Sequence, residues 1–167
     1  MEKNYKEYLQ QITTFIFDVD GVLTDGIVTV TTSGELYRSM NIKDGYALKT
    51  AIERGYNICI ISGGTNEGVR KRLEVLGITD IHLGAKSKTQ LMFDYLKTNN
   101  ISSDTVLYMG DDIPDLKPMQ EVILPCCPKD AVPEIKNASK YVSHKTGGKG
   151  CVRDVIEQVL KAQGKWL

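Results

Sequence analysis

The chain has 167 residues, of which 41% are hydrophobic and 25% charged, and its 21 basic residues balance its 21 acidic ones. This length and composition are typical of one globular domain, residues 1–167, and the balanced charge argues against a nucleic-acid partner. The apolar runs are too short to cross a bilayer and residues 1–11 are too polar for a signal peptide, which predicts a cytoplasmic protein without a membrane partner.

Short segments rich in β-branched and aromatic residues alternate with helical patterns along the chain. The predicted strands lie at 13–18, 56–62, 80–84 and 105–111, and a last short strand is expected within 131–143. The predicted helices lie at 43–55, 66–77, 86–100 and 151–166. This alternation predicts an α/β protein with a Rossmann-like three-layer sandwich, in which a mostly parallel sheet has helices on both faces.

One segment interrupts this alternation, between the first strand and the first helix. Residues 26–42 alternate apolar residues with threonines, turn at Ser33 and Gly34, and then resume the pattern, which predicts an inserted β-hairpin. Asp25 is expected to hold the turn that leads into the hairpin. An irregularity of this size is large enough to act as a lid or as an interface.

Cysteine and histidine give no sign of a redox or zinc site. The four cysteines form no C-x-x-C pair, and they are Cys59, Cys126, Cys127 and Cys151. The two histidines, His82 and His144, lack metal-ligand spacing. We therefore expect buried or incidental thiols in a reducing compartment, and no catalytic role for either histidine.

Polar residues follow three of the predicted strands and begin one predicted helix, and ligands in open α/β sheets bind at such positions. These residues are Asp18 and Asp20, then Ser62, Gly63 and Gly64, then Lys88, and finally Asp111, Asp112 and Asp115. Converging carboxylates need a counter-charge, and Mg²⁺, which shares its oxygen ligands with a substrate phosphate, is a suitable one. One carboxylate could then attack phosphorus while its neighbour transfers protons. A hydroxyl, backbone N–H groups and a lysine would hold the remaining phosphoryl oxygens.

The order of these motifs resembles that of the haloacid dehalogenase (HAD) superfamily of aspartyl-phosphate phosphatases, with "DVDGVLTDG", "ISGG", Lys88 and "GDDIPD". Further stretches are similar to those of 3-deoxy-D-manno-octulosonate 8-phosphate (KDO 8-phosphate) phosphatases, namely "SGELYRSMNIKDGYALK", "VRKRLEVLGI", "GGKGCVRDV" and "LKAQGKW". The resemblance implies a HAD-like fold without a cap domain, and Mg²⁺-dependent hydrolysis of this sugar-acid phosphate in lipopolysaccharide precursor synthesis. It also implies a homotetramer in which the hairpin and neighbouring subunits cover each active site.

The resemblance also implies roles for individual residues. The implied catalytic residues are Asp18, Asp20, Ser62 and Lys88, and the implied Mg²⁺ ligands are Asp18, Asp20, Asp111 and Asp112. The implied substrate-binding residues are Lys43, Asp44, Gly63 and Arg72. Asp18 would be the nucleophile. Asp20 would be the general acid and base, and its backbone carbonyl would also bind the metal. Asp115 would orient Lys88 or the loop.

One position departs from the family pattern. The octulosonate phosphatases usually carry Arg after "ISG" and the related nine-carbon sugar-acid phosphatases carry Glu, whereas this chain has Gly64. A nine-carbon sugar-acid 9-phosphate is therefore an alternative substrate.

Other functions are also open. A non-catalytic regulatory subunit or a phosphotransferase is an alternative to the phosphatase. For the aspartates alone, solvated loop carboxylates or a calcium site are further alternatives, although an EF-hand ligand ladder is absent.

Overall fold

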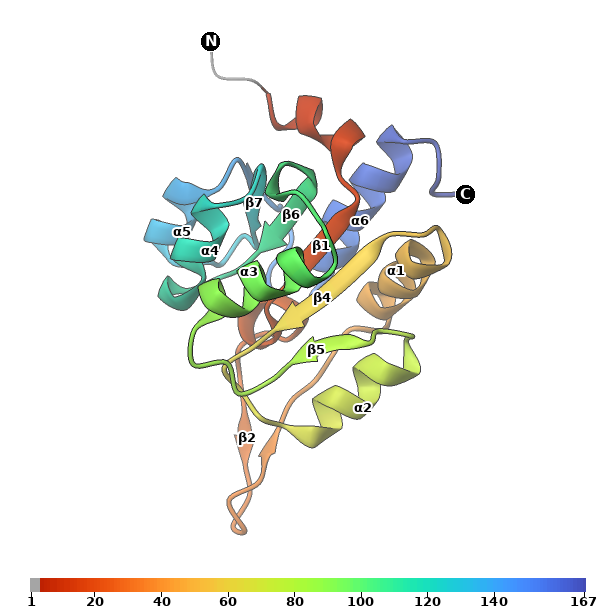
Figure 1. Ribbon diagram of the computed structural model, residues 1–167. Coiled ribbons are helices and arrows are strands. Elements are labelled where there is room, and N and C mark those ends of the chain that lie inside the picture. The colour runs from red at the N-terminus through yellow and green to blue at the C-terminus, as the bar shows by residue number, and fades with distance from the viewer. Residues whose placement is uncertain (1–3) are drawn as a thin grey trace.

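The computed structural model describes residues 4–167, and its centre is a sheet of six strands in which every pairing is parallel (Figure 1). The strands are β1 (Thr14–Phe17), β4 (Asn57–Ile61), β5 (Asp80–His82), β6 (Val106–Met109), β7 (Leu124–Cys127) and β8 (Tyr141–Val142). Their order is β5-β4-β1-β6-β7-β8, so the chain builds outward from β1 to one edge and then to the other. The predicted parallel, Rossmann-like sheet is confirmed, and the direction of winding reverses beside β1.

Helices lie on both faces of the sheet, as predicted (Figure 1). The α-helices are α1 (Ile42–Glu53), α2 (Glu67–Val75), α3 (Lys88–Thr98), α4 (Leu116–Gln120), α5 (Pro133–Ala138) and α6 (Cys151–Ala162). Shorter helical turns are η1 (Tyr5–Gln11), η2 (Val19–Leu23), η3 (Ser103–Thr105) and η4 (Ile113–Asp115). None of the helices within residues 4–167 has the length and apolar character needed to cross a membrane.

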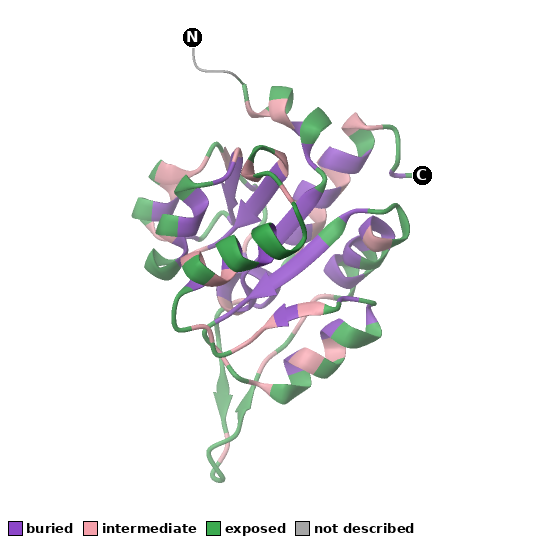
Figure 2. Cartoon of the chain, in the orientation of Figure 1, coloured by how far each residue is buried: buried purple, intermediate pink, exposed green. Residues whose placement is uncertain are grey.

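The alternation of side chains along the strands divides the core between the two faces. In β1, Phe15 and Phe17 belong to the core that includes α1, α2 and α6, whereas Ile16 belongs to the core under α3, α4 and α5. All residues of β1, β6 and β7 are buried (Figure 2). The cysteines are buried as well, as expected. The strand ends that carry the candidate site are therefore fixed by packing from both sides.

Four features of the main fold differ from the prediction, and two of them are the short helices α4 and α5, which are absent from the predicted helices. β7 is absent from the predicted strands because Pro125, which lacks an N–H donor, lies inside it. The strand nevertheless pairs on both sides, and the carbonyl of Pro125 accepts from the N–H of Lys140 at 2.9 Å. The last helix ends at Ala162 rather than at 166, and Trp166 packs edge-on against Tyr46, with ring centroids 6.2 Å apart.

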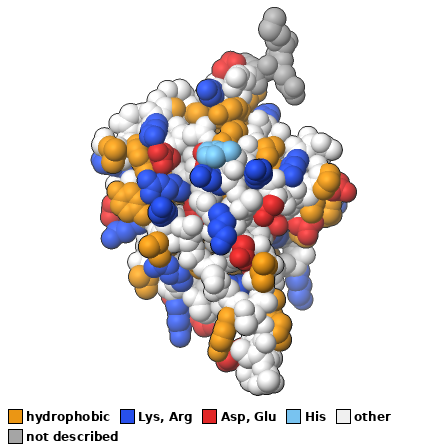
Figure 3. Space-filling model, turned by 180° about the vertical axis from the view of Figure 1, so that it is seen from behind, with side chains coloured by type: hydrophobic (Ala, Val, Ile, Leu, Met, Phe, Trp, Pro, Cys, Tyr) orange, Lys and Arg blue, Asp and Glu red, His pale blue; other side chains and the backbone are white. Residues whose placement is uncertain are grey.

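The predicted hairpin is present and projects away from the sheet (Figure 1). β2 (Thr29–Val30) pairs antiparallel with β3 (Leu36–Tyr37). Ile27, Val30 and Tyr37 are 68%, 66% and 58% exposed, and Figure 3 shows hydrophobic side chains along this projection. Exposed apolar surface of this kind is typical of a contact surface.

Candidate active site

A cavity of about 770 Å³ lies at the carboxyl ends of β1, β4 and β6. Its lining includes residues from every predicted cluster: Asp18, Asp20, Ser62, Gly63, Gly64, Lys88, Asp111, Asp112 and Asp115. They meet because β4 and β6 pair in parallel with the two sides of β1, so all three strands end at one edge of the sheet. The sequence clusters therefore form one site, at the point where the winding of the sheet reverses.

Lys88, the first residue of α3, is the centre of a buried ion-pair network. Its Nζ lies 2.9 Å from Oδ2 of Asp18 and 2.8 Å from Oδ1 of Asp115. The Tyr108 hydroxyl also donates to Oδ1 of Asp115 at 2.8 Å, and the N–H of Asp111 donates to its Oδ2 at 3.3 Å. Asp115 thus holds Lys88, one of the two roles that the resemblance implies for it, and Lys88 reaches the candidate nucleophile.

The electrostatics of the site show a shortage of positive charge. Burial raises the pKa of Asp18 to about 8, and the charge of Asp115 adds to this effect while Lys88 opposes it. Burial and Asp115 also raise the pKa of Asp111 to about 7. Burial alone would lower the pKa of Lys88, but the two neighbouring carboxylates outweigh it and raise that pKa above its usual value. A divalent cation would supply the missing charge.

The carboxylates fit such a cation. Asp18, Asp111 and Asp115 each offer an oxygen, and the three oxygens lie within 4.8 Å of one another. An all-oxygen donor set suits a hard cation such as Mg²⁺. The carboxylate of Asp112 lies apart from this group, is exposed, and accepts from the N–H of Ile113 at 2.7 Å.

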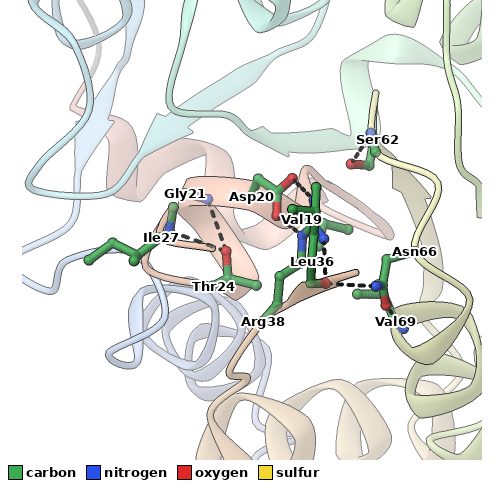
Figure 4. A network of polar contacts seen from close by, with 12 residues as sticks. Val19, Asp20, Gly21, Thr24, Ile27, Leu36, Arg38, Ser62, Asn66 and Val69 are labelled. Carbon is green, nitrogen blue, oxygen red and sulfur yellow. Dashed lines mark hydrogen bonds and ion pairs between the residues drawn. The ribbon is translucent and has the colours of Figure 1, made fainter. Parts of the chain in front are cut away.

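Gly21 permits the close approach of Asp111 to the loop after β1. Its φ is 84°, and a Cβ built there would overlap the Asp111 carboxylate. The loop is also shaped by Thr24, whose Oγ1 accepts from the N–H of Gly21 at 3.3 Å (Figure 4). The carboxylate of Asp25 accepts from the N–H of Ile27 at 3.0 Å, in agreement with its expected role in the turn.

Ser62 is buried directly after β4 at the wall of the cavity. Its N–H donates to the carbonyl of His82 at 2.9 Å, and its Oγ accepts from the N–H of Gly64 at 3.2 Å. The N-cap of α2 is Asn66, whose Oδ1 accepts from the N–H of Val69 at 3.0 Å. Ser62 therefore does not cap α2, and its hydroxyl belongs to the cavity.

Arg38, which sequence reasoning does not single out, reaches the site from the hairpin (Figure 4). Its Nε lies 2.6 Å from Oδ1 of Asp20 and its Nη2 lies 3.1 Å from Oδ2. Its Nη1 donates to the carbonyl of Leu36 at 3.2 Å, and this carbonyl also accepts from Nδ2 of Asn66 at 3.0 Å. The hairpin base is thus tied to Asp20 and to α2. The one sequence signal for Arg38 is its position, because a basic residue there directly follows an apolar strand pattern.

Three of the predicted substrate-binding residues lie outside the lining of this cavity. Asp44 is buried beneath α6, where its Oδ1 accepts from the N–H of Arg153 at 2.8 Å, and burial raises its pKa to about 6. Lys43 lines a separate hollow of about 750 Å³ with several basic residues, and Figure 3 shows Lys and Arg side chains gathered around a histidine. Arg72 lines a groove beside the hairpin together with Arg38. Within one chain, these three residues are not brought to the cavity.

Comparison with known proteins gives concordant results, although no family model matches the chain. The 3-deoxy-D-manno-octulosonate 8-phosphate phosphatase KdsC of Salmonella typhi is 36% identical over 156 residues, which are 93% of this chain and 83% of the relative. The structure of the phosphatase of that name from Yersinia pestis has a TM-score of 0.95 at 31% identity, covering 99% of this chain and 90% of the other. The Moraxella catarrhalis phosphatase, solved with a magnesium ion, a phosphate ion and KDO, has a TM-score of 0.93 at 31% identity, covering 97% and 93%.

Proposed function

Because the chain belongs to the family of 3-deoxy-D-manno-octulosonate 8-phosphate phosphatases, within the HAD superfamily, we propose that Asp18 is the nucleophile of its reaction. The chain is a phosphoric monoester hydrolase that releases phosphate from KDO 8-phosphate, with Mg²⁺ as its cofactor. The observation that carries the residue assignment is the position of Asp18, which is buried at the end of β1, paired with Lys88 and directed to the cavity.

The proposed reaction has two steps. Asp18, held by Lys88 and by the N–H of Val19 at 2.7 Å, attacks phosphorus while Asp20 donates a proton to the departing sugar oxygen. Asp20 then takes a proton from the water that hydrolyses the aspartyl phosphate. The Ser62 hydroxyl and the N–H of Gly63 hold phosphoryl oxygens, and Lys88 balances the charge that develops on them.

The proposed metal ligands are Asp18, Asp111 and the backbone carbonyl of Asp20, with Asp112 as a supporting residue. Asp115 is not among them, because both of its oxygens already accept hydrogen bonds, from Lys88, Tyr108 and the N–H of Asp111. The raised pKa values of Asp18 and Asp111 support this assignment, because burial and the charge of Asp115 disfavour their ionised forms more than Lys88 favours them. When bound, Mg²⁺ offsets the charge of the carboxylates and of the phosphate.

The test is Mg²⁺-dependent phosphate release from KDO 8-phosphate by the wild type and by Asp18→Asn. We expect turnover that chelation abolishes, and a loss of about a thousandfold or more in Asp18→Asn, because the covalent route is removed. Turnover near the wild-type value in Asp18→Asn would refute the assignment of the nucleophile.

A nine-carbon 9-phosphate is the competing substrate, since Gly64 provides no charged side chain at the position where the two subfamilies differ. Gly64 lines the cavity, so either substrate would meet bare backbone there. Steady-state comparison decides between them: a preference of about tenfold or more for the nine-carbon substrate would overturn the octulosonate assignment.

The exposed hairpin supports a further proposal, that the protein is a cytoplasmic single-domain homotetramer with active sites near subunit interfaces. Ile27, Val30 and Tyr37 would then be covered by neighbouring chains. Lys43 and Arg72, which lie outside their own cavity, would contact a substrate bound to an adjacent subunit. Sedimentation velocity at micromolar concentration tests this, and a monomer there would contradict it.

A further inference from the structure

Arg38 brings a charged contact from the inserted hairpin to Asp20. The fork is unequal, because Nε lies 2.6 Å from Oδ1 whereas Nη2 lies 3.1 Å from Oδ2. A guanidinium that binds both oxygens fixes the plane of a carboxylate as well as its position. Oδ1 is therefore held firmly, and Oδ2 is held more weakly.

The fork is rigidly supported. The side chain of Arg38 is 9% exposed, and its Nη1 is anchored on the carbonyl of Leu36, to which the N-cap residue of α2 also donates (Figure 4). Asp20 itself is 37% exposed, and although it lies within η2 its backbone angles are not helical. Within residues 4–167, the hydrogen bonds to its carboxylate come from Arg38. The orientation of Asp20 thus depends on the hairpin.

The surroundings of Gly64 show which oxygen of Asp20 faces the phosphoryl site. A Cβ built at Gly64 would lie 3.3 Å from Oδ2 of Asp20, 3.4 Å from Nη2 of Arg38 and 3.7 Å from Oγ of Ser62. Gly64 and Ser62 both line the cavity. Oδ2 therefore lies beside the loop that holds the phosphoryl group, while Oδ1 is occupied by the guanidinium.

We propose that Arg38 is a positioning residue for Asp20, holding Oδ1 so that Oδ2 is the oxygen that transfers protons. This rests on the proposed function. As the P–O bond breaks, the leaving oxygen keeps its electron pair and takes the proton from Oδ2. In the second step Oδ2 takes a proton from water, whose oxygen bonds to phosphorus and displaces the carboxylate of Asp18. The longer Nη2 contact can open in both steps while the Nε contact is kept.

The experiment compares kcat/KM for three substrates, because this ratio reports the step that breaks the substrate's P–O bond. KDO 8-phosphate and phenyl phosphate have leaving groups that need a proton, whereas p-nitrophenyl phosphate has one that leaves with little help. Arg38→Met should lower kcat/KM by about 10- to 100-fold for the first two and by less than about threefold for the third.

Two further variants complete the design. Arg38→Lys keeps the charge but loses the fork, so its losses should be intermediate and follow the same order of substrates. Arg54→Met removes an exposed arginine at the carboxyl end of α1 and should match the wild type on all three substrates. Circular dichroism and thermal unfolding establish that each variant is folded, and if Arg38→Met is not, Arg38→Lys decides.

Three results would overturn the proposal. Equal losses of kcat/KM in Arg38→Met on all three substrates would indicate a structural role, and a loss on KDO 8-phosphate alone would indicate a direct substrate contact. No loss on any substrate would show that proton transfer by Asp20 does not depend on Arg38. If the wild type does not hydrolyse KDO 8-phosphate, the proposed function fails, and the two aryl phosphates still decide the role of Arg38.

Discussion

Gly21→Ala would show how far metal binding depends on the absence of a side chain at residue 21. Gly21 has a φ of 84°, and the left-handed region costs an alanine about 1–2 kcal/mol. A Cβ at Gly21 would in addition overlap the Asp111 carboxylate, which must move. Gly55, just beyond the end of α1, has the same φ of 84°, but a Cβ built there meets no atom within 4 Å. Gly55→Ala therefore carries the backbone cost alone.

Gly21→Ala should lose at least as much stability as Gly55→Ala, and the two variants should differ in metal affinity. Each should lose about 1–2 kcal/mol of unfolding free energy, which lowers the melting temperature by about 2–8 °C for a chain of this size. Gly21→Ala should also need about 10–100 times more Mg²⁺ for half-maximal activity, as is usual when a group that shapes a metal site is disturbed.

Thermal unfolding in EDTA measures the backbone cost, and Mg²⁺ titration of phosphatase activity measures the metal affinity. Gly55→Ala is the control for both. The same Mg²⁺ requirement in the two alanine variants would refute the reasoning, because it would mean that Asp111 does not depend on the space left by Gly21.

Three other predictions follow from the buried charges. In EDTA, the unfolding free energy should fall as the pH rises from about 4 to 8. The folded-state pKa values of Asp18 (about 8) and Asp111 (about 7) exceed the ordinary value of 3.8. The folded protein therefore binds more protons than the unfolded protein in this pH range. Urea unfolding measures this slope, and excess Mg²⁺ should flatten it. Asp44→Ala should lower the unfolding free energy by about 1–2 kcal/mol and leave KM unchanged, because the first turn of α6 loses a hydrogen-bond acceptor. A higher KM with an unchanged unfolding free energy would instead indicate that Asp44 contacts the substrate. Lys88→Met should lower kcat/KM by about 10²–10³-fold in steady-state assays, because the charge that develops on the phosphoryl group loses its cation. A loss no greater than that of Arg54→Met would contradict this.

The sequence predicts most of the fold and the candidate site wherever local pattern and three-dimensional position agree. Asp18 and Ser62 directly follow buried apolar strands and Asp111 lies one residue beyond another, so a parallel sheet is enough to bring them together. Lys88 begins a helix whose apolar spacing is clear from the sequence. For these residues the assembly of the site is a consequence of strand direction alone.

The features that escape prediction depend on contacts between distant parts of the chain. Arg38 pairs with Asp20 only because the hairpin folds back over the loop after β1. Asp44 stands in the first turn of α1, where a carboxylate is normally solvated, but α6 covers it through a contact that spans 109 positions. Pro125 opposes strand formation locally, and pairing with two neighbours overrides it.

The burial of all four cysteines makes the hairpin suitable for site-specific labelling. Burial raises the pKa of each thiol, so little of the reactive thiolate forms at neutral pH. A cysteine introduced at Ser33, in the exposed hairpin turn, would therefore react with a maleimide dye in preference to the native thiols. Fluorescence from that position would report directly whether the hairpin moves when a phosphorylated sugar acid enters the cavity.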